Sequence, residues 1–261
     1  GKKELFKGLA IDSLENEWAE HPVFHISFGG ENFLKAGTLD DKLENAISGW
    51  EEIYGTSPHY TTLGNRFIYV LKAAHQKYGK RAVVLIDEYD KPLLDVIDTN
   101  TKVKVDCNEL LLEDHNRNLL KGFYSVFKEA DADLQFVLLT GVTKFSQVSV
   151  FSGFNQPADI SMDPRYDSLC GITEDELYQY FDEPISGLAK VYRCSIDEMK
   201  ERLKKHYDGY HFSDALVDIY NPFSILNACA RLRIADFWFA TGTPTYLIRL
   251  LNHNKENLNE L

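Results

Sequence analysis

The first half of the chain alternates between two kinds of hydrophobic pattern. Short runs of aliphatic, β-branched and aromatic residues occupy positions 22–28, 82–86 and 136–140, as is typical of strands. Between these runs, apolar residues recur at helical spacing, over 39–54, 65–78 and 110–127. This alternation predicts βαβ units in an α/β fold, with a mainly parallel sheet flanked by helices. The unbroken apolar runs further predict that the last two strands are buried on both faces.

The pattern changes after residue 140. Residues 141–170 are rich in Ser, Gly, Asn and Asp, which predicts a long active-site loop. Shorter helices are expected beyond it. Thr173 with Glu176, and Ser195 with Glu198, have the spacing of capping boxes that start two of these helices.

These patterns divide the chain into two parts, an α/β core over residues 1–170 and a smaller, mostly helical lid over residues 171–261. The 16 Phe and 14 Tyr against 2 Met predict a core closed by aromatic packing. The four cysteines form no C-x-x-C pair, which argues against zinc and disulfides and favours a cytoplasmic protein. No apolar run approaches the roughly 18 residues of a membrane helix, so no membrane partner is expected.

The net charge is −12, from 28 Lys plus Arg against 40 Asp plus Glu. Nucleic-acid binding usually begins with a basic face that releases counterions from phosphates. No cluster of Lys and Arg stands out here, so direct nucleic-acid binding by this chain is not expected.

The strongest chemical signal is the apolar run 83–86 followed directly by Asp87 and Glu88. A buried strand ending in Asp-Glu is a Walker B arrangement, which holds two carboxylates at the edge of the sheet where ligands bind in α/β folds. Asp87 is then expected to hold Mg²⁺, the metal cofactor of ATP. Glu88 is expected to orient and deprotonate the attacking water. The alternative is a surface loop whose acids are merely solvated.

A phosphate-binding loop would read G-x-x-x-x-G-K-[ST] after an earlier strand. Gly79-Lys80-Arg81 and Gly1-Lys2-Lys3 both lack the hydroxyl residue at the last position, and no other segment fits. The opening residues read like the end of a helix already under way. We therefore interpret the chain either as a fragment or as a chain whose first stretch was not seen.

The strand 136–140 leads into Thr140 and, shortly after it, Thr143. In ATPases a polar side chain at this edge senses the γ-phosphate or positions water, and either threonine could do so. The alternative is a threonine that only caps the next loop.

Several motifs together resemble the bacterial AAA-ATPase-like family. They run in one order from F-K-G-L at residue 6 to Pro244 and include L-I-D-E-Y-D-K-P-L, T-G-V-T-K-F-S-Q-V-S-V-F-S-G-F-N, L-C-G-I-T-E-D-E-L, H-Y-D-G-Y-H-F, Y-N-P-F-S-I-L-N and F-W-F-A-T-G-T-P-T. The resemblance implies a P-loop NTPase-like fold, with Asp87 and Glu88 as magnesium and water residues and Thr140 or Thr143 as sensor. It also implies a phosphate loop upstream of this sequence, with which ATP and Mg²⁺ would bind, and, in many members, a C-terminal domain resembling PD-(D/E)XK nucleases.

Two other features have simpler interpretations beside the functional ones. His206 and His211 could form a ligand cluster, but two histidines five residues apart do not share a helix face, which favours a glycine turn between packed tyrosines. Arg165 could act as an arginine finger toward a neighbour, whereas a surface salt bridge to Asp163 or Asp167 is the simpler interpretation.

Three functions fit this pattern. The first is an ATPase switch, and the second is an interaction or scaffold module that does not hydrolyse ATP. The third is a helicase, because Asp87-Glu88-Tyr89-Asp90 fits a D-E-x-D box. A helicase would carry Ser-Ala-Thr on the next strand and a second similar core, and neither is found here. We therefore expect an ATPase whose activity in this chain alone is uncertain without a phosphate loop.

Overall fold

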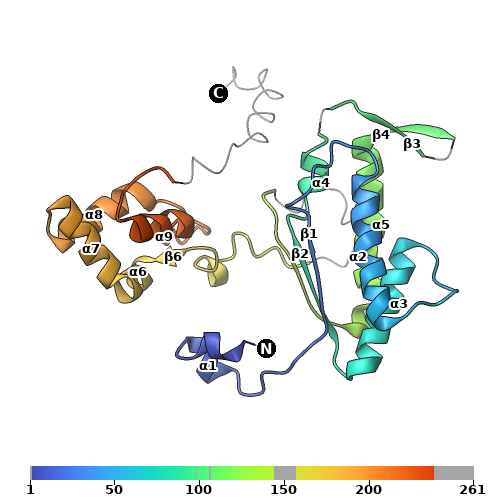
Figure 1. Ribbon diagram of the computed structural model, residues 1–261, viewed down its shortest axis with the longest axis horizontal. Coiled ribbons are helices and arrows are strands. Elements are labelled where there is room, and N and C mark those ends of the chain that lie inside the picture. The colour runs from blue at the N-terminus through green and yellow to red at the C-terminus, as the bar shows by residue number, and fades with distance from the viewer. Residues whose placement is uncertain (1, 98, 106, 144–156, 238–261) are drawn as a thin grey trace. The chain divides into compact units, whose positions relative to one another are not determined.

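A computed structural model describes residues 2–97, 99–105, 107–143 and 157–237 (Figure 1). The chain divides into two compact units, Gly1–Pro157 and Ala158–Leu261. The sequence placed the division later, between residues 170 and 171. Residues just after 157 belong with the second unit, where the Ser213 hydroxyl donates a hydrogen bond to Asp167 Oδ2 at 3.1 Å.

The first unit contains a three-stranded parallel sheet with the order β1-β2-β5, which confirms the expected α/β class. Residue pairs in register include Ser27 with Asp87 and Ile86 with Leu139. The described elements of this unit are η1 (Lys3–Phe6), α1 (Ala10–Leu14), β1 (Val23–Ser27), α2 (Thr38–Tyr54), α3 (Leu63–Tyr78), β2 (Ala82–Asp87), α4 (Lys91–Leu94), β3 (Lys102–Val105), β4 (Asn108–Leu111), α5 (Leu112–Glu129), η2 (Asp131–Asp133) and β5 (Leu134–Leu139).

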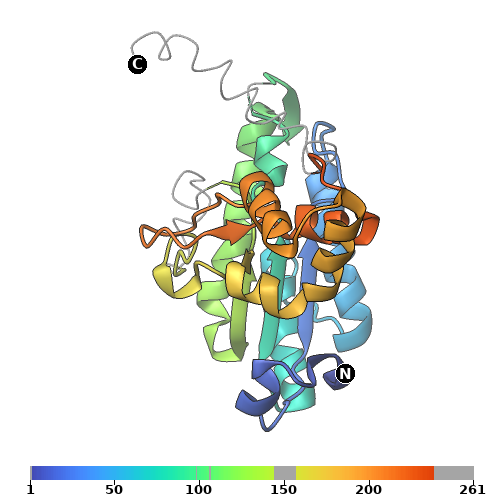
Figure 2. The ribbon, with the colours of Figure 1, turned by 90° about the vertical axis from the view of Figure 1, so that its left-hand side faces the viewer.

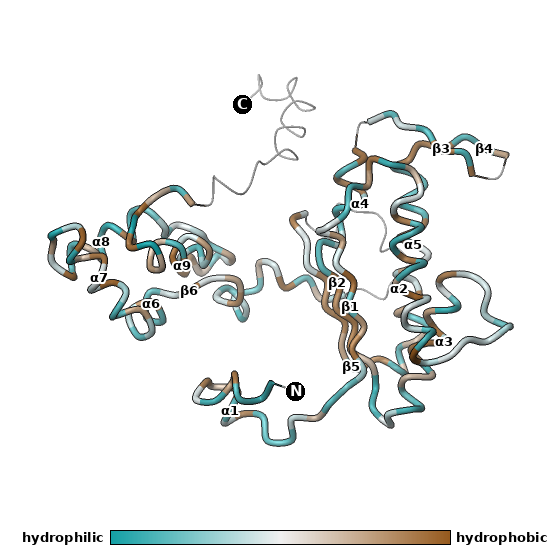
Figure 3. Tube along the Cα trace, viewed as in Figure 1, coloured by the Kyte–Doolittle hydropathy of each residue, from teal (hydrophilic) through white to brown (hydrophobic). Residues whose placement is uncertain are grey.

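The strands of this sheet are buried mainly on one face. Val84 and Ile86 of β2 are almost fully buried, but Val83 and Leu85 of the same strand are only half-buried and Phe136 of β5 is 52% exposed. The expectation of burial on both faces was therefore wrong. The physical reason is that α2, α3 and α5 lie together on one side of the hydrophobic strands (Figures 1 and 3).

Aromatic rings form the centre of the core between the sheet and these helices, as the composition predicted. Phe67 of α3 stacks on Phe123 of α5, with ring centroids 5.1 Å apart and an interplanar angle of 1°. Phe24 of β1 meets Trp50 of α2 edge-on at 5.0 Å. Phe24 also meets Phe67 at 6.0 Å, so these contacts join the sheet to all three helices. Such pairs add about 0.5–1.5 kcal/mol beyond the area that they bury.

The segment before α5 differs from its sequence prediction. The helix was expected to include Leu110, but Leu110 lies in β4 and pairs with Val103 of β3 in an antiparallel hairpin. The helix begins at Leu112. Three consecutive leucines are compatible with the hydrophobic period of a helix and with that of a strand. Leu110 and Leu111 form a strand because they pair with the alternating residues Lys102–Val105.

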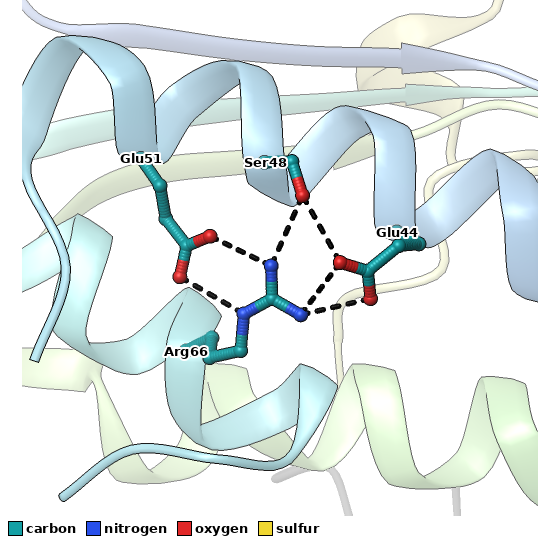
Figure 4. Close-up of polar contacts among 4 residues, drawn as sticks. All are labelled: Glu44, Ser48, Glu51 and Arg66. Atoms are coloured by element: carbon teal, nitrogen blue, oxygen red, sulfur yellow. Dashed lines mark hydrogen bonds and ion pairs between the residues drawn. The ribbon is translucent and has the colours of Figure 1, made fainter. Parts of the chain in front are cut away.

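Helices α2 and α3 are joined by one arginine (Figure 4). The Arg66 guanidinium donates to both carboxylate oxygens of Glu51, at 2.9 and 2.6 Å, and to both of Glu44, at 2.8 Å each. It also donates to the Ser48 hydroxyl at 3.1 Å. These bonds raise the pKa of Arg66, and its bond to Glu44 is the main cause that lowers the pKa of that carboxyl. Paired forks of this kind fix the register of the two helices.

The second unit has its own hydrophobic core, in which Leu203, Tyr220 and Ile225 are fully buried. Both capping boxes expected from the sequence are present, at Thr173 with Glu176 and at Ser195 with Glu198. None of the described helices in either unit is long and apolar enough to cross a membrane. The described elements, shown in Figures 1 and 2, are η5 (Pro164–Tyr166), β6 (Ile172–Thr173), α6 (Glu174–Tyr180), α7 (Asp182–Tyr192), α8 (Ile196–Tyr207), β7 (Ile219–Tyr220) and α9 (Pro222–Arg231).

Candidate functional site

The carboxyl ends of β1, β2 and β5 meet at one edge of the sheet, because the three strands are parallel. Backbone hydrogen bonds extend the pairing past the strand ends. Thr140 N–H donates to the carbonyl of Ile86 at 2.9 Å, and Phe28 N–H donates to the carbonyl of Asp87 at 3.0 Å. The segments after Ile86 and Leu139 therefore emerge at the same edge, where the sequence analysis expected the Asp-Glu pair and the candidate threonines.

Asp87 lies between hydroxyl groups from both neighbouring strands. The Thr140 hydroxyl donates to Asp87 Oδ1 at 2.6 Å, and the Ser27 hydroxyl donates to Oδ2 at 3.4 Å. Asp87 is exposed, so its remaining lone pairs face solvent. Two neutral donors thus orient the carboxylate without neutralising its charge.

Glu88, the next residue, has an unusual backbone. Its φ is +54°, in the left-handed region that residues other than glycine rarely adopt. Its carbonyl accepts a hydrogen bond from Lys91 N–H at 3.0 Å, which closes a turn. The Glu88 side chain lies against Gly29, where an added Cβ would be only 2.7 Å from Glu88 Oε1. The turn therefore directs this carboxylate toward the end of β1.

Asp90 is the most buried acid of the group, at 1% exposure. Its Oδ2 accepts three hydrogen bonds, from Val142 N–H at 2.9 Å and from the backbone N–H and the hydroxyl of Thr143 at 2.6 Å each. A buried carboxylate needs such donors to offset its lost hydration. Asp90 thereby fastens the turn after β2 to the segment after β5.

The structure separates the two candidate sensor threonines. The hydroxyl of Thr140 contacts Asp87, whereas that of Thr143 is bonded to the buried Asp90. The Thr143 carbonyl also accepts a hydrogen bond from the Tyr89 hydroxyl at 2.6 Å. Of the two hydroxyl groups, that of Thr140 therefore contacts the exposed acid at the sheet edge, and that of Thr143 contacts the buried acid.

Sequence reasoning did not assign roles to Ser27, Gly29 or Asp90. Ser27 and Gly29 lie about 60 residues before the carboxylates that they contact, so no local pattern joins them. A usable signal was present in two places. The pair Gly29-Gly30 directly follows a strand, and Asp90 completes the run Asp-Glu-Tyr-Asp.

The other candidates make ordinary pairs within the second unit. Arg165 is exposed and binds Asp163, with Nη2 2.6 Å from Oδ2, and this bond lowers the pKa of Asp163 to about 2. His206 and His211 pair with two different acids, Asp236 and Asp218. Among the described residues, no three His, Cys, Asp or Glu side chains converge to hold a metal. Of the loop expected over 141–170, residues 144–156 lie outside the described part.

The oxygen donors at the sheet edge fit Mg²⁺ by their chemistry. This ion prefers hard oxygen ligands and is usually bound through one or two carboxylates, with waters and substrate phosphates completing its shell. Asp87 supplies an exposed carboxylate that is already oriented by Thr140 and Ser27. A convergent cluster of protein ligands is not required for this kind of site.

Comparison with known proteins identifies the family of the chain. A family model described as "Predicted AAA-ATPase" matches residues 1–151. A protein of Azotobacter chroococcum mcd 1, named "Uncharacterized protein in vnfD 5'region", is 36% identical over 255 residues, which are 98% of this chain and 45% of that protein. The chain thus spans less than half the length of that relative. No solved structure matches the chain. With more than half of its residues matched by the family model, the chain belongs to the AAA-ATPase-like family.

Proposed function

We propose that this chain is the Walker B and sensor part of a magnesium-dependent ATPase that works as a nucleotide switch. The observation that carries the proposal is the hydrogen bond of 2.6 Å between the Thr140 hydroxyl and Asp87 Oδ1. It joins the ends of two parallel strands at the edge where ligands bind in α/β folds, and Glu88 is the next residue after Asp87.

Asp87 is assigned to hold Mg²⁺, which supplies neutralisation of the charge on the phosphates of ATP when it is bound. Thr140 and Ser27 keep the Asp87 carboxylate in one orientation. Because the Thr140 proton is donated to Asp87, the free lone pairs on its oxygen can accept a hydrogen bond from water. This favours a role in placing water over a role as donor to the γ-phosphate.

Glu88 is assigned as the general base that orients the attacking water and takes its proton. Its carboxylate forms no ion pair with the described residues and lies against Gly29. The left-handed backbone at this residue is consistent with a functional position, since strained conformations cluster at active sites.

The test compares two isosteric variants of the full gene product. Glu88→Gln keeps size and hydrogen bonding but removes the proton acceptor. ATP turnover is expected to fall by about 10²–10⁴-fold, with the affinity for MgATP retained. Asp87→Asn is expected to weaken MgATP binding as well as turnover, because it loses the charge that attracts the metal.

Glu52→Gln, an exposed acid near the end of α2, is the matched control and should behave as wild type. Full turnover in Glu88→Gln would show that this carboxylate is not the base. If the wild-type gene product binds MgATP without hydrolysing it, an interaction module that does not hydrolyse ATP becomes the better proposal for the function of this chain.

A further inference from the structure

The end of β1 contains two adjacent glycines with different surroundings. At Gly29 an added Cβ would be 2.7 Å from Glu88 Oε1, 3.1 Å from Cδ and 3.4 Å from Oε2. At Gly30 an added Cβ would meet nothing within 4 Å. Neither residue has the positive φ that would require glycine for its backbone.

The missing side chain at Gly29 therefore provides space and not backbone freedom. All three atoms of the Glu88 carboxyl group lie within 3.4 Å of the position that a Cβ would take. Real Cβ atoms are essentially never found at 2.7 Å from another heavy atom, so a side chain at position 29 and the present Glu88 conformation exclude each other.

The backbone at position 29 is held in place and does not simply move aside. Phe28 N–H donates to the carbonyl of Asp87 at 3.0 Å, and Gly29 N–H donates to the Ser27 hydroxyl at 3.3 Å. Ser27 in turn contacts Asp87. The partner that yields to a new methyl group is thus the far end of the Glu88 side chain, which is flexible.

We propose that Gly29 is a positioning residue for Glu88. The Glu88 carboxylate occupies the space that a Cβ at position 29 would fill, so any side chain there displaces the carboxylate. This inference rests on the proposed role of Glu88 as the base. A general base acts only within hydrogen-bond reach of the proton that it removes. A displacement of about 1 Å can reduce a rate by as much as about 10²-fold.

A purely structural role for Gly29 has a different consequence. If the glycine were needed only for folding, alanine would lower stability, and activity would fall in proportion to the folded fraction. In the positioning role the clash is relieved by a rotamer change of Glu88. Stability and MgATP affinity then stay close to wild type, and kcat alone falls.

The experiment measures ATP turnover of the full gene product for Gly29→Ala and, as matched control, Gly30→Ala. For Gly29→Ala we expect kcat to fall by about 10- to 100-fold, with KM for ATP and the thermal midpoint little changed. For Gly30→Ala we expect wild-type kinetics. In a Glu88→Ala background, Gly29→Ala should cause no further loss of the residual turnover, because the group that it displaces is absent.

Three kinetic outcomes would overturn the inference. They are wild-type kcat in Gly29→Ala, an equal loss in Gly30→Ala, or an undiminished loss in the Glu88→Ala background. Crystal structures of both alanine variants separate this inference from the proposed function. A wild-type protein without ATP turnover refutes the ATPase assignment. A Glu88 carboxylate that stays in place in Gly29→Ala refutes the positioning role of Gly29.

Discussion

Glu88 shows how a single residue at this site is held against its own preference. The left-handed backbone places Cβ close to the following carbonyl and costs about 1–2 kcal/mol for a residue other than glycine. Its neighbours are fixed on both sides, Asp87 by pairing with β1 and Tyr89 by its N–H bond of 2.9 Å to the Thr140 carbonyl. The sheet edge thus keeps the strained turn that presents the carboxylate.

This strain predicts that glycine at position 88 is more stable than alanine, the reverse of the order inside a helix. Glu88→Gly should be more stable to urea than Glu88→Ala by about 1 kcal/mol, because glycine adopts the left-handed conformation without a Cβ penalty. Asn45, an exposed residue within α2, serves as the control. There the order reverses, with Asn45→Gly less stable than Asn45→Ala by about 1 kcal/mol. Equal stability of the two Glu88 variants would show that the turn is unstrained.

At the scale of elements, the sequence patterns located most helices and strands but not the contacts between their ends. An apolar run followed by two acids is a local pattern, so Asp87 and Glu88 could be identified from it. The contact of Ser27 with Asp87 joins segments 60 residues apart and depends on the register of β1 with β2. The β3–β4 hairpin was missed for the same reason, since pairing partners decide between helix and strand in a short leucine run.

The junction between the turn after β2 and the segment after β5 depends on Asp90. Asp90→Ala leaves two backbone N–H groups and one hydroxyl without their acceptor, so we expect a loss of about 2–3 kcal/mol in the free energy of unfolding. Thr143→Val removes one of these three bonds and should cost about 1 kcal/mol. Urea denaturation of both variants checks the order. An Asp90→Ala protein as stable as wild type would mean that the cost of burying this charge equals the stabilisation from its three hydrogen bonds.

The Arg66 cluster between α2 and α3 predicts a dependence of stability on pH. The pKa of Glu44 is lowered from 4.5 in the folded state, mainly by its bond to Arg66. The folded state therefore binds this proton less readily than the unfolded state. The resulting stability is present above about pH 4.5 and is lost as the pH falls through the lowered pKa.

Arg66→Leu removes this contribution together with the fork that joins the helices. We expect lower stability at pH 7 and a smaller further loss between pH 5 and about pH 3 than in wild type. The free energy of unfolding, measured by urea titration across this range, gives both quantities. Arg66→Lys serves as a control that keeps the charge but loses the paired hydrogen-bond geometry. Its stability should lie between those of wild type and Arg66→Leu. Parallel pH curves for wild type and Arg66→Leu would contradict the assignment.

At the scale of the whole molecule, the chain consists of two units with separate hydrophobic cores. The sequence indicated two parts because hydrophobic periodicity changed from alternating strands and helices to short capped helices. It did not place the division, since residues 157–170 have loop composition and their assignment depends on tertiary contacts such as that of Asp167 with Ser213. The proposed role of the second unit as a lid remains a prediction.

Gly171 offers a test of whether the second unit folds on its own core. An added Cβ at this residue, directly before β6, would overlap Ile219 Cγ2 of β7. Gly171→Ala is therefore expected to destabilise this unit by about 1–3 kcal/mol, the usual range for overpacking. Hydrogen exchange with mass spectrometry should show faster exchange in α6–α9 and unchanged protection in β1, β2 and β5.

A compensating variant distinguishes overpacking at this contact from a general loss of folding. Ile219→Ala removes the Cγ2 atom that the new methyl group would overlap. On its own it should be destabilising, because Ile219 is 1% exposed and its truncation leaves a cavity. The double variant Gly171→Ala with Ile219→Ala should then be less destabilised than the sum of the two single changes. Additive losses, or faster exchange that spreads into β1 and β2, would mean that the two cores do not unfold as separate units.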